Sequence, residues 1–277
     1  MARIDAHQHF WRYDPVEYDW INGEMRVLQR DFLPPDLAPL LAEMGMDGCI
    51  AVQARQSEEE THFLLQLAAA YPFIKGVVGW LDLSAPDLEE RLEAFRSFSA
   101  LKGIRHIVQA EPDPDFLLRP DFLKGVKMLG KAGLTYDILV YERQMPTVLK
   151  FLELCPDQPM VLDHIGKPVI QEGPSAAWKA GIRGIASHPA VYCKLSGLVT
   201  EADWSNWSAD DFLPFLDVVL EAFGPQRLMI GSDWPVCLLA ADQYRLVLDI
   251  IGQFSEDWPA EERAALWGDT ATRCYRL

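Results

Sequence analysis

Cysteine is scarce in this chain, and its spacing excludes the usual cysteine frameworks. Five cysteines occur among 277 residues, and no two of them have C-x-x-C spacing. An odd number without this spacing argues against a disulfide framework and against a structural zinc module. We therefore expect reduced, buried thiols at Cys49, Cys155, Cys193, Cys237 and Cys274.

Positive charge is also in short supply. The chain carries 25 Lys and Arg residues against 41 Asp and Glu residues, which gives a formal net charge of −16. This surplus of negative charge repels phosphate backbones and anionic lipid headgroups, and no cluster of basic residues offsets it. We therefore expect neither a nucleic acid nor a membrane among its partners.

Long apolar runs are missing as well. No stretch approaches the roughly 18 uncharged apolar residues of a membrane-spanning helix. The first residues, 1–7, contain no apolar leader segment. We therefore expect a cytoplasmic protein.

What the chain does contain is a regular alternation of two patterns. Short apolar, β-branched runs are typical of buried strands, and they occur at residues 4–9, 49–54, 74–83, 103–108, 134–141, 160–164, 191–195 and 228–233. Segments with 3.6-residue periodicity predict helices at 35–44, 58–71, 86–98, 120–132, 143–154, 175–187, 209–223, 239–254 and, at the C-terminal end, 259–275.

This alternation predicts an α/β fold. Strands that alternate with helices over this length are typical of a single (β/α)8 TIM barrel, here one domain over 1–277 with a C-terminal helix. A doubly wound open sheet is the alternative, but the G-x-G-x-x-G pattern after its first strand is missing.

Histidines and an aspartate stand where a TIM barrel places its catalytic groups, at the C-terminal ends of strands. His7 and His9 close the first predicted strand and, being two residues apart, project to the same face. His164 ends the sixth predicted strand and Asp233 ends the eighth. These three imidazoles and one carboxylate suit a divalent metal ion, with Zn²⁺ as the best match, which would activate a water and polarise a carbonyl.

Other polar residues at strand ends are candidates for holding a substrate. Arg105 and His106 end the fourth predicted strand, and because neighbours in a strand point to opposite faces, we expect one of them to face the centre. Tyr141 and Lys194, on the fifth and seventh strands, could donate to a substrate hydroxyl or carbonyl.

Two tryptophans beside strand ends suggest the kind of substrate. Trp80 and Trp234 offer flat aromatic faces that suit the C–H surface of a sugar ring. Arginines at strand ends are few, which argues against a dicarboxylate, because each carboxylate would want bidentate pairing.

Four short motifs stand at the predicted strand ends: His7-x-His9-Phe10, Asp163-His164-x-Gly166-Lys167-Pro168, Cys193-Lys194-Leu195-Ser196-Gly197-Leu198 and Gly231-Ser232-Asp233-Trp234-Pro235. Together they resemble the amidohydrolase superfamily. Within it, the chain is similar to the lactonase branch that includes L-fuconolactonase, L-rhamnonolactonase and 2-pyrone-4,6-dicarboxylate lactonase. The resemblance extends from Ile4 to the C-terminal Trp267-Gly268-Asp269-Thr270-Ala271 segment.

The resemblance implies roles for the strand-end residues. His7, His9 and His164 would face a metal or the substrate carbonyl, and Asp233 would take the proton from the attacking water. Binuclear members of the superfamily carry a carboxylated lysine or a glutamate at the end of the fourth strand and a histidine at the end of the fifth. This chain has neither, so a binuclear site is not expected, and some lactonases of this kind polarise the carbonyl with histidines alone.

We therefore expect a hydrolase that opens a sugar-acid lactone, of the L-fucono or L-rhamnono type, by water attack on the ester carbonyl. Asp233 and His164 are the expected catalytic residues, and the partner is a small-molecule lactone. The alternative is a metal-dependent decarboxylase of the same superfamily, which would release CO₂. The sequence leaves a homo-oligomer open.

Overall fold

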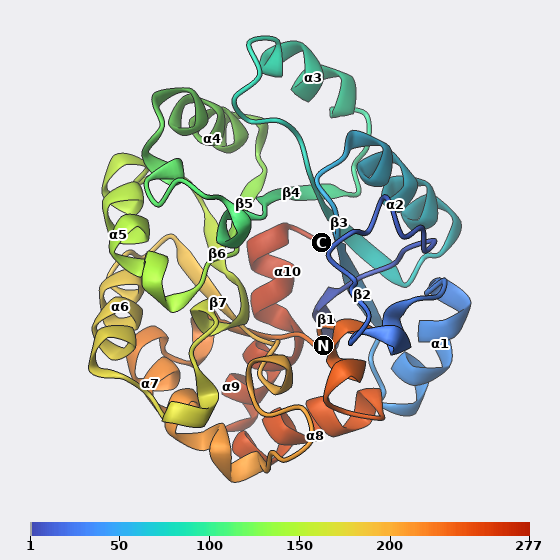
Figure 1. Cartoon of the computed structure of the whole chain (residues 1–277), viewed down its shortest axis with the longest axis vertical. Coiled ribbons are helices and arrows are strands. Elements are labelled where there is room, and N and C mark those ends of the chain that lie inside the picture. The colour runs from blue at the N-terminus through green and yellow to red at the C-terminus, as the bar shows by residue number, and fades with distance from the viewer. Residues whose placement is uncertain (1) are drawn as a thin grey trace.

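Eight parallel strands follow one another around a ring in the computed structural model, which describes residues 2–277 (Figure 1). Their order in the sheet is their order in the sequence: β1 (Ile4–Gln8), β2 (Gly48–Val52), β3 (Ile74–Gly79), β4 (Leu101–His106), β5 (Thr135–Ile138), β6 (Met160–Leu162), β7 (Val191–Leu195) and β8 (Leu228–Ile230). Just beyond β8, Asp233 N donates to His7 O over 2.8 Å and His9 N donates to Trp234 O over 2.6 Å, which joins the last strand to the first. The predicted TIM barrel is confirmed.

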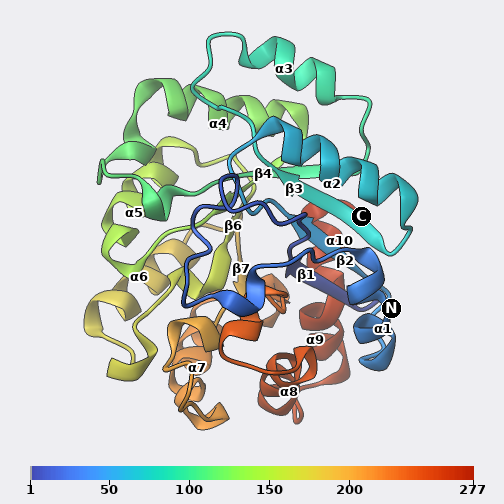
Figure 2. The same cartoon turned by 45° about the vertical axis from the view of Figure 1, so that its right-hand side comes forward.

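Helices connect the strands and cover the outside of the barrel (Figure 2). The buried face of the α4 helix follows the 3.6-residue period through Phe122, Val126 and Leu129, and the helix is followed by Gly133 in the left-handed conformation. The outer helices are α1 (Pro34–Glu43), α2 (Glu58–Ala70), α3 (Leu88–Phe95), α4 (Pro120–Ala132), α5 (Met145–Leu154), α6 (Ala176–Ala186), α7 (Leu213–Phe223) and α8 (Tyr244–Phe254).

The predicted C-terminal helix is broken into three pieces. The α9 helix (Ala260–Ala264) and the α10 helix (Thr270–Tyr275) are separated by a π-helical segment, Ala265–Asp269. The cause is a close approach at Gly268, where a Cβ atom would overlap the carbonyl oxygen of Ala2. The backbone leaves helical geometry at this glycine so that the chain can pass the N-terminal strand.

The α10 helix closes the N-terminal end of the barrel. Lys102 Nζ donates to the Arg276 carbonyl over 2.9 Å, and Arg276 Nη1 donates to the Gly133 carbonyl over 3.1 Å, so the C-terminal residues lie beside the starts of β4 and β5. Cys274 and Tyr275 pack against apolar side chains of the barrel interior, namely Ile4, Ala6, Ile50, Val52, Val78, Val161 and Met229. This end of the barrel is therefore an apolar core.

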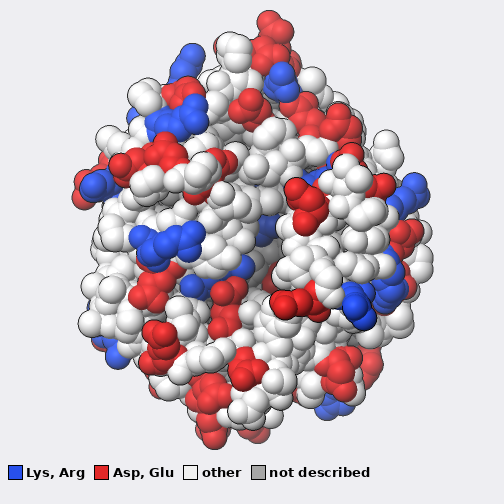
Figure 3. All heavy atoms as spheres, viewed as in Figure 1, with Lys and Arg blue, Asp and Glu red and all other residues white. Residues whose placement is uncertain are grey.

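Among residues 2–277, no helix is long and apolar enough to cross a membrane. All five cysteines are free and buried, as predicted. Acidic side chains are scattered over the face drawn in Figure 3, in keeping with the net charge of −16.

Candidate active site

A cavity of about 650 Å³ lies among the loops that follow β1, β2, β4, β6 and β8. His9, His164 and Asp233 line it. His7 has no exposed surface and lies directly behind them, with its ring centroid 5.0 Å from that of His9 and 4.4 Å from that of His164. The four residues that the sequence placed at three strand ends are therefore brought together.

The partners of His7 and His9 indicate where the protons of these two rings lie. Nδ1 of His9 is 2.8 Å from the backbone oxygen of Val52, which only accepts, so this nitrogen carries a proton. Nδ1 of His7 lies 3.4 Å from Asp163 Oδ1, and its Nε2 accepts a hydrogen bond from Arg105 Nη1 over 3.2 Å. In the neutral rings both Nε2 atoms therefore carry a lone pair, 3.2 Å (His9) and 3.7 Å (His7) from Asp233 Oδ1. The lone pair of His7 accepts from Arg105, and that of His9 faces the carboxylate.

A nitrogen lone pair and a carboxylate oxygen repel each other unless a cation or a proton lies between them. The histidine nitrogens and the Asp233 carboxylate together fit a divalent ion. His7, His164 and Asp233 each offer a ligand atom, and these atoms lie within 4.8 Å of one another. Imidazole nitrogens and a carboxylate oxygen are ligands that Zn²⁺ accepts, and the outer partners of the rings fix the tautomer that a ligand needs. The permanent charge of Arg105 beside His7 disfavours a second ion.

His164 owes its position to an early end of β6. The strand stops at Leu162, and His164 (φ 53°) and Ile165 (φ 48°) turn into the left-handed region. Nδ1 of His164 lies 2.9 Å from Ser196 Oγ, and the glycine that follows this serine, Gly197, leaves room for the ring because a Cβ there would overlap Nδ1. Both the Asp163 and His164 side chains are therefore buried at the centre, although they are neighbours in sequence.

Asp163 joins the histidines to two buried cations, a role that the sequence analysis missed. Its Oδ2 accepts from Arg105 Nη1 over 3.0 Å, and its Oδ1 lies 3.0 Å from Lys194 Nζ and 3.4 Å from His7 Nδ1. The available signal was its place next to His164 in the Asp163-His164 motif, but a regular strand would have turned it away from the centre.

Burial and charge set the protonation of the cluster. Burial opposes ionisation of Asp233, but in acid the positive charge of protonated His164, with smaller contributions from His9 and His7, outweighs it and holds the pKa of Asp233 below its ordinary value. Burial lowers the pKa of His164 to about 4 and the pKa of His7 well below its ordinary value. At neutral pH the cluster therefore holds an ionised carboxylate beside neutral His7 and His164 rings, the state that a general base requires.

Strand alternation decides between the two candidates on β4. Arg105 lines the cavity. His106 points to the other side, where its ring stacks on Phe116 with centroids 4.6 Å apart and its Nε2 lies 2.6 Å from Glu111 Oε1. His106 therefore does not reach the cavity.

The other predicted substrate residues do not line this cavity either. Lys194 is fully buried beneath it and is held by two aspartates, and Trp234 is packed edge-on against Phe32 with centroids 5.2 Å apart. Trp80 is half-buried and donates its Nε1–H to His106 over 3.3 Å. Tyr141 lines a neighbouring hollow that shares Lys167 with the cavity. Trp234 is buried in the core, which is why its strand-end position did not bring it to the cavity.

Four further lining residues were not selected as site residues from the sequence. They are Trp20, Arg55, Gln109 and Lys167, and none of them lies on a strand. Their positions depend on how the long loops fold over the barrel, which strand periodicity does not predict.

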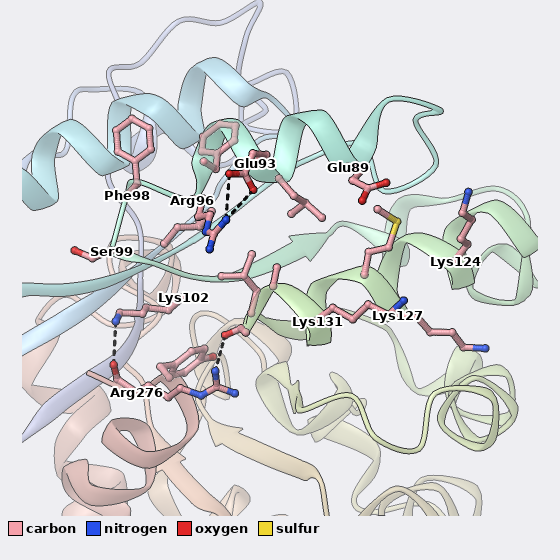
Figure 4. Close-up of a pocket in the computed structure, with 18 residues that line it drawn as sticks. Glu89, Glu93, Arg96, Phe98, Ser99, Lys102, Lys124, Lys127, Lys131 and Arg276 are labelled. Atoms are coloured by element: carbon pink, nitrogen blue, oxygen red, sulfur yellow. Dashed lines mark hydrogen bonds and ion pairs between the residues drawn. The ribbon is translucent and has the colours of Figure 1, made fainter.

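A second, larger hollow of about 880 Å³ lies between α3 and α4 (Figure 4). Lys124, Lys127 and Lys131 of α4 line it. Glu93 of α3 and Arg96, which follows that helix, also line it and form an ion pair with an N···O distance of 3.2 Å. None of the clustered histidines borders this hollow. The candidate active site is therefore the 650 Å³ cavity and not this hollow.

Comparison with known proteins agrees with this arrangement. The chain is 49% identical, over 99% of its length and 96% of the relative's, to an L-fucono-1,5-lactonase of Burkholderia multivorans, and 36% identical, with 99% and 96% covered, to an L-fucono-1,5-lactonase of Burkholderia ambifaria. A crystal structure of an amidohydrolase from Burkholderia multivorans with bound zinc superposes with a TM-score of 0.97 at 48% identity, covering 100% of both chains. The amidohydrolase family model matches residues 4–277. The chain therefore belongs to the amidohydrolase family.

Proposed function

We propose that this protein hydrolyses the ring ester of a sugar-acid lactone of the L-fucono-1,5-lactone class. The observation that carries the proposal is the near-complete alignment, at 49% and 36% identity, with two L-fucono-1,5-lactonases. The buried His and Asp cluster in the 650 Å³ cavity supplies chemistry suited to ester hydrolysis. The same alignments favour a hydrolase over the alternative decarboxylase.

In the proposed mechanism Asp233 is the general base. Its ionised carboxylate takes a proton from the attacking water and later returns it to the leaving alkoxide of the opened ring. His164 is the second catalytic residue: in the metal-free site Ser196 can donate to Nδ1, so that the proton of the neutral ring sits on Nε2 and can be donated to the ester carbonyl. Were His164 to hold a metal ion through Nε2, Nδ1 would instead donate to Ser196 Oγ. Arg105 is placed to hold a ring oxygen of the substrate.

His7, His9, His164 and Asp233 are the residues that would hold a metal ion, for which we propose a single Zn²⁺. A bound ion would supply Lewis acidity to the carbonyl or the water. The unprotonated Nε2 atoms of His7 and His9, 3.7 Å and 3.2 Å from Asp233 Oδ1, support this assignment; a bound ion would displace the hydrogen bond from Arg105 to His7.

The charges around the cavity favour a neutral substrate. Each of its three buried or half-buried cations already has a carboxylate partner: Arg105 with Asp163, Arg55 with Glu17 and Lys167 with Glu201. A dicarboxylate would therefore find no unpaired cation among them. Buried polar atoms of Trp20, Arg55 and Gln109 have no hydrogen-bond partner within residues 2–277, and a polyhydroxy ring offers both donors and acceptors to such groups.

We further propose that the enzyme works in the cytoplasm, because five free, buried cysteines suit a reducing compartment. A homo-oligomer is compatible with this proposal.

A panel of lactones tests the function. The purified protein, with and without added Zn²⁺, is mixed with L-fucono-1,5-lactone, L-rhamnono lactones, butyrolactone and an aromatic carboxylate, and proton release and CO₂ are followed at fixed pH. We expect rapid proton release from the aldonolactones without CO₂. CO₂ from the aromatic acid, or no reaction with any aldonolactone, would overturn the proposal.

A further inference from the structure

Below the catalytic residues the barrel contains a layer of charged side chains. Asp137 (β5), Asp163 (after β6) and Lys194 (β7) have no exposed surface, and Arg105 (β4) has 3%. Barrel interiors are usually filled by branched apolar side chains, as is the layer beneath this one. A fully buried lysine is therefore an exception within this core.

These charges form a continuous chain of contacts from the C-terminal helix to the cavity. Tyr275, on α10, donates its hydroxyl to Asp137 Oδ2 over 2.6 Å, and Lys194 Nζ donates to the same oxygen over 2.6 Å. Lys194 Nζ also lies 3.0 Å from Asp163 Oδ1. Asp163 in turn contacts His7 Nδ1 at 3.4 Å and Arg105 Nη1 at 3.0 Å.

The layer is balanced in charge and specific in geometry. It holds two cations, Arg105 and Lys194, and two anions, Asp137 and Asp163. A buried ion network of this kind is often no more stable than apolar side chains of the same size, so stability alone does not account for it. Its upper end consists of the two groups that contact each other beside Asp233: the His7 ring and the Arg105 guanidinium.

We infer that Lys194 and Tyr275 are positioning residues for the proposed hydrolysis: Tyr275 and Asp137 hold the Lys194 ammonium, and Lys194 fixes the carboxylate of Asp163, which orients His7 and Arg105. The inference rests on the proposed function for its kinetic consequence, but the orientation of His7 does not depend on it. Lys194, which the sequence suggested as a substrate donor, acts from beneath the site instead.

The test uses a variant that keeps the buried charges balanced. Lys194→Met combined with Asp137→Asn removes one cation and one anion, so that Arg105 and Asp163 remain paired. We expect a folded protein whose kcat for the aldonolactone falls at least about tenfold while KM changes less than about twofold, because reacting groups are misoriented and the cavity wall is kept. If Lys194 and Asp137 served only to balance charge, the double variant would keep the wild-type kcat, and the inference would be wrong.

A milder substitution checks the lower end of the chain. Tyr275→Phe deletes only the hydroxyl that binds Asp137, and we expect it to lower kcat by about threefold or more at nearly constant KM. The matched control is Tyr136→Phe, since the Tyr136 hydroxyl is buried and has no partner among the described residues. Equal kinetics for the two variants would contradict a role for Tyr275.

A spectroscopic readout separates this inference from the proposed function. In the metal-free, ¹⁵N-histidine-labelled protein, we expect His7 to be in the Nδ1–H tautomer, and the double variant to lose that single form; the His7 signal is assigned by its absence from His7→Asn. If the wild-type protein opens no lactone, the proposed function fails and the tautomer still decides the inference. A folded double variant with an unchanged His7 signal would overturn it.

Discussion

At the scale of single residues, Asp233 is the carboxylate on which the proposed mechanism depends. Its Oδ1 lies within 3.7 Å of Nε2 of both His7 and His9, and its low pKa keeps it ionised at neutral pH. We predict that Asp233→Asn lowers kcat by at least about 10², the usual worth of a positioned base, with the fold unchanged. Steady-state kinetics and circular dichroism check this, and a folded variant with near-normal kcat would remove Asp233 from the role.

Arg105 is a second residue whose charge has a measurable consequence. Its Nη1 lies 3.2 Å from Nε2 of His7, one of the proposed metal ligands, so its positive charge opposes a cation bound there. We predict that Arg105→Met tightens Zn²⁺ binding at least about tenfold, which corresponds to about 1.4 kcal/mol. Competition with a coloured chelator measures the affinity.

The control for this prediction is Arg105→Lys, which keeps the charge. It should bind Zn²⁺ with an affinity nearer to that of the wild type than Arg105→Met does. If both variants bind equally tightly, or neither differs from the wild type, the charge of Arg105 does not oppose the metal.

At the scale of secondary-structure elements, Glu60 ties α2 to two loops at the cavity. Its Oε2 accepts from the backbone N–H groups of Ala54 and Arg55 over 2.9 Å each, and its Oε1 accepts from the Tyr18 hydroxyl over 3.0 Å. Burial nevertheless raises the pKa of Glu60 to about 7 from an ordinary value of 4.5. The folded state therefore binds this proton more tightly than the unfolded chain does.

The free energy of unfolding should therefore contain a contribution from Glu60 that falls by about 3 kcal/mol as pH rises from about 4.5 to about 7. Gln at this position keeps an acceptor for the backbone and cannot ionise, so Glu60→Gln should lack this contribution. Urea unfolding at pH 4.5 and pH 8 measures it, with exposed Glu59→Gln as the control. A difference between Glu60→Gln and wild type that does not change with pH would contradict the prediction.

The broken C-terminal helix gives another prediction at this scale. A Cβ at Gly268 would overlap the Ala2 carbonyl, so Gly268→Ala must displace either β1 or the π-helical segment, and we expect a loss of about 2 kcal/mol or more in the free energy of unfolding. Gly252, inside α8, has only Trp267 near its would-be Cβ, at 3.8 Å. Gly252→Ala should therefore be neutral or stabilise by up to about 1 kcal/mol. Equal stability of the two variants would show that the close approach is unimportant.

At the scale of the whole molecule, the assembled cavity should select among substrates. Its cations are paired and unpartnered polar atoms remain in its wall, so a neutral polyhydroxy ring suits it better than an unsubstituted ring or a dicarboxylate. We predict that kcat/KM for L-fucono-1,5-lactone exceeds that for butyrolactone by more than about 10², because hydroxyls lost from the substrate leave buried polar groups unpaired. Comparable rates, or faster hydrolysis of a pyrone dicarboxylate, would show that these polar groups do not select the substrate.

The barrel architecture and the meeting of four strand-end side chains could be predicted from the sequence alone. Eight buried strands and the helices between them were readable because burial imposes a fixed period on each element. The cluster of His7, His9, His164 and Asp233 followed, because a barrel brings the ends of its strands to one place. The local sequence pattern was enough to predict a residue's location wherever its place along a strand fixed its place in the barrel.

Which polar side chains reach the cavity depends on tertiary packing and could not be predicted from the sequence. Lys194 and Trp234 stand at strand ends but are buried in the core. Lys194 is paired with two aspartates, and Trp234 packs against neighbouring aromatic rings. Arg55 and Lys167 reach the cavity from loops, whose course depends on contacts between distant segments. The early end of β6, which turns Asp163 and His164 inward together, is set by the same long-range packing, and no local period encodes it.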